Sequence, residues 1–343
     1  MDATADRGCY EETNIGSPES IMSAEEKINQ LQKFIKKPRD IVSIGVGSGA
    51  ELIALINLYK SADIHIYGMD LSQKAINNVK LTLEERGLNA SLILGSAIEK
   101  HFPNDSIDVF VESSLLHEIY SYVSEGKKAW KKAIEVISEQ LAEGGIFLLR
   151  DFSSPESDKC AELTLTTDIS IEFYRYFKKS YKRFEGWNKS DVDNIRDIEE
   201  IRYNEYPESV GNKIILNLSK AAEFLLHFKN FYQDYTNNTA TLNDPKWKEI
   251  NETYYIPNPY KQDFVPMPIT EYVDAVLKTA NDCLLDTPYK LICVQKETSQ
   301  RIKTAEFLKN HFCLKAINTQ TSEQELFNET TAKMELVFKK IRK

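Results

Sequence analysis

Long apolar runs, paired cysteines and clustered metal ligands are all missing from this sequence of 343 residues. The five cysteines include no Cys-x-x-Cys pair, which argues against a disulfide framework and a cysteine-ligated zinc site. No stretch reaches the ~18 apolar residues of a membrane-spanning helix, and the start lacks the apolar centre of a signal peptide. We therefore expect a soluble cytoplasmic protein with no membrane partner and no metal site.

Basic residues are in the minority, because 43 Lys and Arg stand against 52 Asp and Glu, giving a net charge of -9 at pH 7. A negative chain is repelled by polyanions unless its cations are locally clustered. The overall charge thus gives no support for a nucleic-acid partner. The sequence does not indicate an oligomeric state.

Strands and helices alternate from about residue 40 to Phe152, which predicts an α/β fold with a mostly parallel sheet. Five apolar segments are expected to be its strands: 40–46, 64–72, 90–97, 107–115 and 145–152. Helical spacing of apolar residues predicts the helices between them, at 50–62, 73–87 and 126–144.

The start of the chain is predicted to have no core contacts. Residues 1–22 are polar and without periodicity, so we expect a disordered tail. A helix is predicted from Ser23, since Ser23 and Glu26 have the spacing of a capping box, and it should end before Pro38.

The alternation stops after Phe152, and residues 153–298 are predicted to form a large, mainly helical insertion. Its clearest expected helices span 168–184 and 212–235, each with an apolar stripe at helical spacing. The stripes are Phe173, Tyr176, Phe177, Tyr181 and Phe184 in the first, and Ile215, Leu218, Ala222, Leu225 and Phe228 in the second.

Residues 299–343 are expected to form a helix and then a terminal antiparallel hairpin that completes the main sheet. The two strand-like segments, 313–322 and 334–343, are too close in sequence for a parallel crossover. Residues 288–297 are also strand-like, but their pattern does not decide which sheet they join.

Glycine is scarce, with 13 in the chain, yet Gly45, Gly47 and Gly49 follow the first predicted strand directly. Glycine lets the backbone turn tightly and approach a ligand closely. Asp70 ends the second predicted strand, where an acid typically binds ribose hydroxyls. This pattern predicts an adenosine-containing cofactor, but by itself it fits NAD as well as S-adenosylmethionine.

Further motifs resemble those of the class I, Rossmann-like, S-adenosylmethionine-dependent methyltransferases. Besides Gly-x-Gly-x-Gly at residues 45–49, they are Gly95-Ser96-Ala97 after the third strand, the fourth strand with its extension to Glu118, and the Gly-Gly turn before the fifth. The family usually has acids where this chain has Ser43 and Ser96. The resemblance implies a doubly wound sheet, S-adenosylmethionine as cofactor, methyl transfer as the reaction, and a set of cofactor-binding residues: Gly45, Val46, Gly47, Gly49, Asp70, Leu71, Ser96, Ala97, Glu112 and Ser113.

Residues that follow the fourth strand should face the reacting atoms, because ligands of open α/β sheets bind beyond the carboxyl ends of the strands. His117, Glu118 and Tyr120 are the catalytic candidates. His117 would serve as a base and Glu118 would orient it or bind an acceptor amine. The alternative is that His117 caps or packs against a short helix. Arg150 and Asp151 contact the acceptor or cofactor, or else pair with each other at the surface.

The insertion is the expected lid and acceptor-recognition element, and a small molecule or a protein side chain is the favoured acceptor. Residues 174–189 combine Arg and Lys with Tyr and Trp, as an RNA-binding segment does, but an ordinary amphipathic helix fits them better. An RNA methyltransferase and an NAD(P)-dependent oxidoreductase remain as alternatives.

Overall fold

The chain divides into two compact units, which are described separately: unit 1 (Met1–Asp151, Val273–Glu297, Glu335–Lys343) and unit 2 (Phe152–Tyr272, Thr298–Met334). A computed structural model describes residues 18–60, 63–122, 126–156, 159–180, 182–184, 200–203, 207–238, 241–242, 268–299, 302–317, 322–331 and 333–343.

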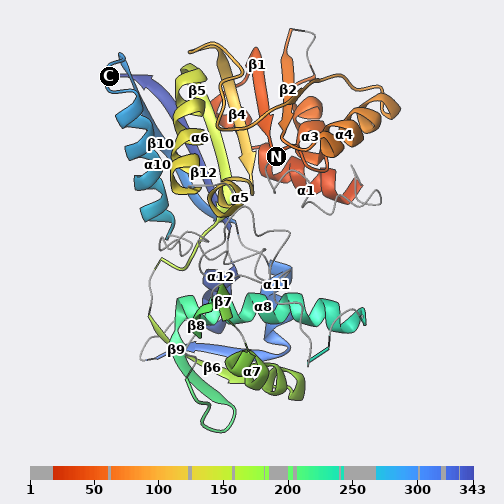
Figure 1. The fold of residues 1–343 in the computed structure, drawn as a ribbon, viewed down its shortest axis with the longest axis vertical. Coiled ribbons are helices and arrows are strands. Elements are labelled where there is room, and N and C mark those ends of the chain that lie inside the picture. Colours follow the sequence, from red (N-terminus) through yellow and green to blue (C-terminus); the bar gives the residue numbers. More distant parts are fainter. Residues whose placement is uncertain are drawn as a thin grey trace. The chain divides into compact units, whose positions relative to one another are not determined.

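Unit 1 is built on a seven-stranded sheet with the strand order β10-β12-β5-β4-β1-β2-β3 (Figure 1). The strands are β1 (Asp40–Ile44), β2 (His65–Asp70), β3 (Ser91–Leu94), β4 (Ile107–Ser113), β5 (Leu141–Phe152), β10 (Tyr289–Ser299) and β12 (Lys333–Arg342). β1 pairs in parallel with both β2 and β4, β2 with β3, and β4 with β5. The predicted α/β class and mostly parallel sheet are confirmed.

The helices of unit 1 pack their apolar sides into the same core as the strands of its sheet. They are α1 (Pro18–Ile28), α2 (Leu31–Phe34), α3 (Ala50–Leu58), α4 (Gln73–Glu85), α5 (Leu116–Tyr122), α6 (Gly126–Gln140) and most of α10 (Ile269–Cys283). α1 packs on α3, α5 on α6, and α4 on β2 and β3 (Figure 1). Ile41 and Val42 of β1 are fully buried, as expected of a strand covered on both faces.

The first helix begins earlier than predicted, at Pro18 rather than Ser23. Ile21 and Ala24 are buried in the core of unit 1, so packing rather than a capping box sets this boundary. The expected tail therefore cannot extend to residue 22. The predicted helix also divides into α1 and α2, with a turn at Asn29 and Gln30 between them.

The predicted terminal hairpin is wrong. β12 does join the main sheet, but its neighbours are β5 and β10, the strand whose sheet the sequence left open. The other expected arm, β11 (Phe312–Ala316), pairs antiparallel with β6 in unit 2. The predicted insertion is also too long at its carboxyl end, since Val273–Glu297 belongs to unit 1.

Unit 2 combines strands with helices, so the prediction of a mainly helical insertion is corrected. β6 (Cys160–Leu165) is the central strand of an antiparallel sheet between β11 and β9 (Lys213–Asn217), and β7 (Lys182–Phe184) pairs with β8 (Glu200–Tyr203). Its helices are α7 (Asp168–Ser180), α8 (Leu218–Thr236), α11 (Ile302–Lys309) and α12 (Glu323–Thr331) (Figure 1). The expected helix from residue 212 begins only at Leu218.

Aromatic rings fill the core of unit 2. Phe173 of α7 packs against Phe224, Phe228 and Phe231 of α8, with ring centroids 4.5 to 5.8 Å apart. This confirms Phe173 and Phe228 as core residues, whereas Ile215 is 56% exposed on β9. Of the basic and aromatic segment 174–189 that suggested RNA binding, residues 174–180 belong to α7 and 182–184 to β7, whereas 181 and 185–189 lie outside the described residues.

Candidate cofactor and active site

The glycine-rich turn lies between β1 and α3 and has the backbone conformation that requires glycine. Gly45, Gly47 and Gly49 have φ angles of 71°, 48° and 78°, in the left-handed region. The N–H of Gly45 donates to the carbonyl of Met69 at 2.7 Å, which holds the turn beside the end of β2. A Cβ on Gly45 would lie 3.1 Å from the Leu115 side chain, so a larger residue would crowd the segment after β4.

Asp70, at the end of β2, organises the turns on both sides of itself. Its Oδ2 accepts from the N–H of Gly47 at 2.9 Å, and its Oδ1 accepts from the N–H of Ser72 at 2.8 Å. A carboxylate oxygen can accept two hydrogen bonds, so each still has capacity for a ligand hydroxyl. Asp70 is thus a ready acceptor for a ribose while it fixes the glycine-rich turn.

The turn after β3 lies against the same end of the sheet. The N–H of Gly95 donates to the carbonyl of Asp70 at 3.0 Å, and the His101 ring nitrogen Nε2 lies 3.0 Å from the Ser96 carbonyl oxygen. A Cβ on Gly95 would approach His101 to 2.3 Å, so only glycine fits beneath this ring. The turn therefore presents Ser96 and Ala97 in a fixed conformation.

Glu112, near the end of β4, is fully buried and supports the turn that leads into α5. Its Oε1 accepts from the N–H groups of Leu115 and Leu116, at 2.5 and 3.1 Å, while its Oε2 is buried with no hydrogen-bond partner. Burial, followed by the negative charge of Asp151, raises the pKa of the Glu112 carboxyl well above its usual value. Glu112 is therefore a support for this turn, not a wall of the cavity.

His117 forms a close pair with Asp151, from the end of β5. Its Nδ1 lies 2.6 Å from Asp151 Oδ1, and its backbone N–H donates to Asp151 Oδ2 at 3.0 Å. The two side chains are 13% and 2% exposed. Arg150 pairs with Glu335 of β12, with its Nε 2.8 Å from Glu335 Oε1.

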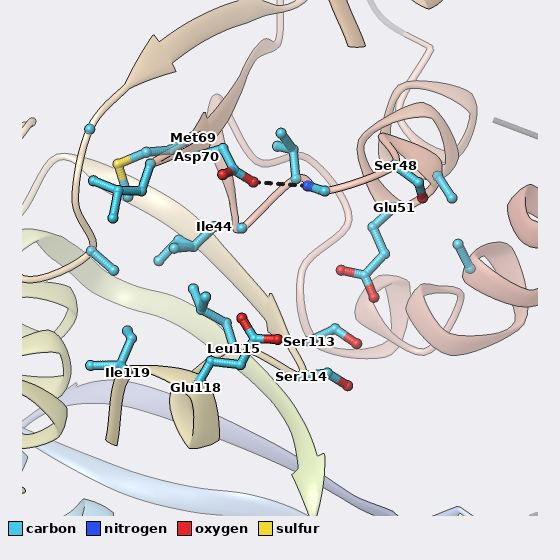
Figure 2. Close-up of a pocket in the computed structure, with 18 of the residues that line it drawn as sticks. Ile44, Ser48, Glu51, Met69, Asp70, Ser113, Ser114, Leu115, Glu118 and Ile119 are labelled. Carbon is cyan, nitrogen blue, oxygen red and sulfur yellow. Dashed lines mark hydrogen bonds between the residues drawn. The ribbon is translucent and has the colours of Figure 1, made fainter. Parts of the chain in front are cut away.

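A cavity of about 420 Å³ lies where these segments meet, within unit 1 (Figure 2). The predicted cofactor residues that line it are Gly45, Val46, Gly47, Asp70, Leu71, Ser96, Ala97 and Ser113, whereas Gly49 and Glu112 do not. Of the predicted catalytic residues, Glu118 lines it, but His117 and the buried Tyr120 do not. His117 nevertheless lies on the same turn of α5 as Glu118.

Sequence reasoning missed two contributions to the cavity. Ser20, Ser23 and Lys27 of α1 line one side, at a helical spacing that would have been recognisable had the helix been extended back to Pro18. Glu51, in the first turn of α3, was missed although it follows the glycine-rich turn. Figure 2 shows Glu51 and Glu118 reaching toward the same space from α3 and α5.

These residues fit S-adenosylmethionine. The glycine-rich turn and Asp70 suit the ribose, and apolar Leu71, Ala97 and Ile98 beside Ser96 suit an adenine ring. Of the described residues that line the cavity, Glu51, Asp70 and Glu118 are acidic and Lys27 is basic. This charge balance is complementary to a ligand that carries a sulfonium and an ammonium group with one carboxylate. Among the described residues, no three His, Cys, Asp or Glu side chains form a metal site.

Comparison with known families supports the same assignment. Residues 41–145 match a family model described as a methyltransferase domain. The chain is 27% identical over 118 residues to a tRNA N(3)-methylcytidine methyltransferase, trm140, of Schizosaccharomyces pombe. This alignment covers 33% of the chain and 36% of that relative, so the chain spans about a third of the relative's length.

Two solved structures have low similarity over nearly the whole chain. YcgJ of Bacillus subtilis is 12% identical, with a TM-score of 0.42 and coverage of 94% of this chain and 99% of that one. A methyltransferase of Clostridium acetobutylicum described as S-adenosylmethionine-dependent is also 12% identical, with a TM-score of 0.41 and coverage of 94% and 91%.

Residues 41–145 therefore match a methyltransferase domain, and the mostly parallel sheet of unit 1 agrees with the fold expected of the class I, S-adenosylmethionine-dependent methyltransferases. The resemblance drawn from the glycine-rich turn, Asp70 and the segments after β3 and β4 is thereby confirmed, together with the cofactor class. The match lies entirely within unit 1. In the part of the chain that the structure describes, no helix has the length and apolarity to cross a membrane.

Proposed function

We propose that this chain transfers the methyl group of S-adenosylmethionine to a small molecule or to a protein side chain. The observation that carries this proposal is the acidic cavity of unit 1, formed by the glycine-rich turn, Asp70 and the segment after β4. When bound, the cofactor supplies a methyl group on a positively charged sulfur. The cavity residues would hold it and keep water away from the reacting carbon.

The position of Glu51 favours this cofactor over a nicotinamide dinucleotide. In dinucleotide-binding folds the pyrophosphate lies at the amino end of the first helix, where backbone N–H groups and the helix dipole attract anions. Here that helix carries the Glu51 carboxylate in its first turn, facing the cavity. A carboxylate there repels a diphosphate and attracts a cationic ligand.

His117 is proposed as the base that removes a proton from the acceptor. An acceptor hydroxyl or ammonium must lose a proton when it is methylated, and a neutral imidazole is suited to take it near neutral pH. The short distance to Asp151 and the position beside cavity-lining Glu118 support this role. Glu118 would bind or orient the acceptor, and Tyr120, being buried, would support α5.

Calorimetric titration of the purified chain with S-adenosylmethionine, S-adenosylhomocysteine and NAD tests the proposal. We expect micromolar binding of the first two ligands and none of NAD. Asp70→Ala should weaken both by at least about 10-fold, since it removes the ribose acceptor and loosens the glycine-rich turn. Glu51→Gln should also weaken them without touching that turn. Asp282→Ala, at an exposed position of α10, is the matched control.

Binding of NAD alone would overturn the methyltransferase proposal. Equal affinities in wild type and in the Asp70 and Glu51 variants, with each variant folded by circular dichroism, would place the cofactor elsewhere. These outcomes concern the cofactor, so they leave the acceptor for separate tests.

RNA is the second candidate acceptor, and the name of the Schizosaccharomyces pombe relative is the observation in its favour. The alignment covers only 33% of this chain and 36% of that relative. Such a partial similarity supports methyl transfer as the reaction more than RNA as the acceptor, because elements outside the core fold usually recognise the acceptor.

A further inference from the structure

Three ionisable groups meet at the carboxyl ends of β4 and β5. Asp151 Oδ1 contacts His117 Nδ1 at 2.6 Å, Asp151 Oδ2 accepts from the backbone N–H of His117 at 3.0 Å, and Glu112 lies close enough for its charge to interact with Asp151. Asp151 is 2% exposed and Glu112 is fully buried. A carboxylate with so little access to water needs compensating partners.

The two contacts from Asp151 to one residue fix the orientation of the imidazole. The backbone contact holds the start of α5, and the side-chain contact holds the ring, so neither can rotate without breaking a bond to the same carboxylate. Since an ionised carboxylate only accepts hydrogen bonds, His117 Nδ1 must carry the proton. In the neutral imidazole, Nε2 is then the basic nitrogen.

Other charged groups near this pair come from β4, β5 and α5. On β4, burial raises the pKa of the Glu112 carboxyl, so Glu112 holds a proton more readily than an ordinary glutamate. On β5, Arg150 pairs with Glu335 of β12. On α5, Glu118 follows His117 and lines the cavity.

We propose that Asp151 is the positioning residue for His117, which it holds in the Nδ1–H tautomer with Nε2 as the nitrogen that takes a proton from the acceptor. This inference rests on the proposed function, because it assigns the tautomer of the proposed base. Asp151 itself need not touch cofactor or acceptor. During methyl transfer the acceptor's proton goes to Nε2, and Asp151 stabilises the imidazolium that results.

Substitution of Asp151 by Asn gives a sharp test of the tautomer. In Asp151→Asn the amide oxygen must stay opposite the backbone N–H of His117, which places the NH₂ group against Nδ1. Nδ1 must then accept, so the ring proton moves to Nε2. Long-range proton–nitrogen NMR spectra of protein with ¹⁵N-labelled histidine distinguish the two tautomers. The chain has five histidines, and His117→Gln identifies the signals of His117.

We expect Nδ1–H in the wild type and Nε2–H in Asp151→Asn, at about pH 8.5, where an ordinary imidazole is neutral. Asp282→Asn should leave the spectrum of His117 unchanged. A proton on Nε2 of His117 in the wild type would overturn the proposal, even if the variant fails to fold. A proton that stays on Nδ1 in folded Asp151→Asn would show that Asp151 does not set the tautomer.

Calorimetry on the same samples separates this inference from the proposed function. S-adenosylhomocysteine should bind wild type and Asp151→Asn within about twofold, because Asp151 does not line the cavity. Absence of binding to the wild type would contradict the proposed function, whatever tautomer His117 adopts. A loss of binding confined to Asp151→Asn would show that Asp151 supports the cofactor site and would overturn its assignment to His117 alone.

Discussion

Glu112 shows how a single buried carboxyl connects the site to stability. It supports the N–H groups of Leu115 and Leu116 at the start of α5, yet its second oxygen has no hydrogen-bond partner. A group whose pKa is raised by folding contributes most favourably below its unfolded pKa. That contribution is lost as the pH rises through the folded pKa.

Glu112→Gln should therefore be more stable relative to wild type at pH 7.5 than at pH 5, as measured by urea unfolding. From about pH 4.5 upward, Glu112 loses its proton in the unfolded chain but keeps it in the folded protein. The free energy of unfolding of the wild type therefore falls by up to about 1.4 kcal/mol per pH unit over this window. Glutamine does not titrate. Glu85→Gln, at an exposed position on α4, is the control. If the free energies of unfolding of wild type and Glu112→Gln changed with pH in parallel, folding would not raise the pKa of Glu112.

The predicted site residues that line the cavity are those whose place follows from the order of strands and turns. Gly45, Gly47 and Asp70 follow buried parallel strands, whose carboxyl ends meet at one edge of the sheet, so the sequence order places them together. The partnership of His117 with Asp151 joins residues 34 positions apart and depends on the register of β4 and β5. No local pattern carries that information.

At the scale of elements, β9 of unit 2 escaped detection because its apolar run continues in sequence into α8. In β9 the buried residues are Ile214 and Leu216, and the apolar Ile215 between them is exposed, a period of two. Five residues are too few to separate this period from the helical one that follows in α8. The parallel strands of unit 1 were found because each is bounded by turns.

Lys340 of β12 shows how a strand near the sequence end of unit 1 stabilises a distant helix. Its ammonium group is buried at the carboxyl end of α6, where it donates to the carbonyls of Ser138 and Leu141 at 2.9 and 2.7 Å and contacts Asp105 at 2.6 Å. A cation there satisfies carbonyls that have no partner within the helix and is favoured by the helix dipole.

Lys340→Met should lower the free energy of unfolding by about 2–3 kcal/mol, because it leaves these buried carbonyls without a donor while keeping the apolar stem. Lys339→Met, the adjacent residue on the other face of β12, should change it by less than about 1 kcal/mol. Equal urea midpoints for the two variants would show that the ammonium group of Lys340 contributes little.

On the scale of the whole molecule, charge bears on the choice of acceptor. The net charge is -9, and the cofactor cavity itself is acidic. Against this background α6 exposes Lys127, Lys128, Lys131 and Lys132 in its first two turns. This exposed lysine cluster is one described surface where phosphates would bind if RNA were the acceptor.

We expect fluorescently labelled transfer RNA to bind only weakly, with little anisotropy change at micromolar protein in about 150 mM salt, since the overall charge repels a polyanion. Binding that is tight at about 50 mM salt and falls steeply by about 200 mM would instead favour RNA as the acceptor. Lys127→Glu with Lys131→Glu should then weaken it further, whereas Lys303→Glu on α11 of unit 2 should not. That combined result would overturn the small-molecule or protein acceptor while leaving the S-adenosylmethionine site, and the test of Asp70, unaffected.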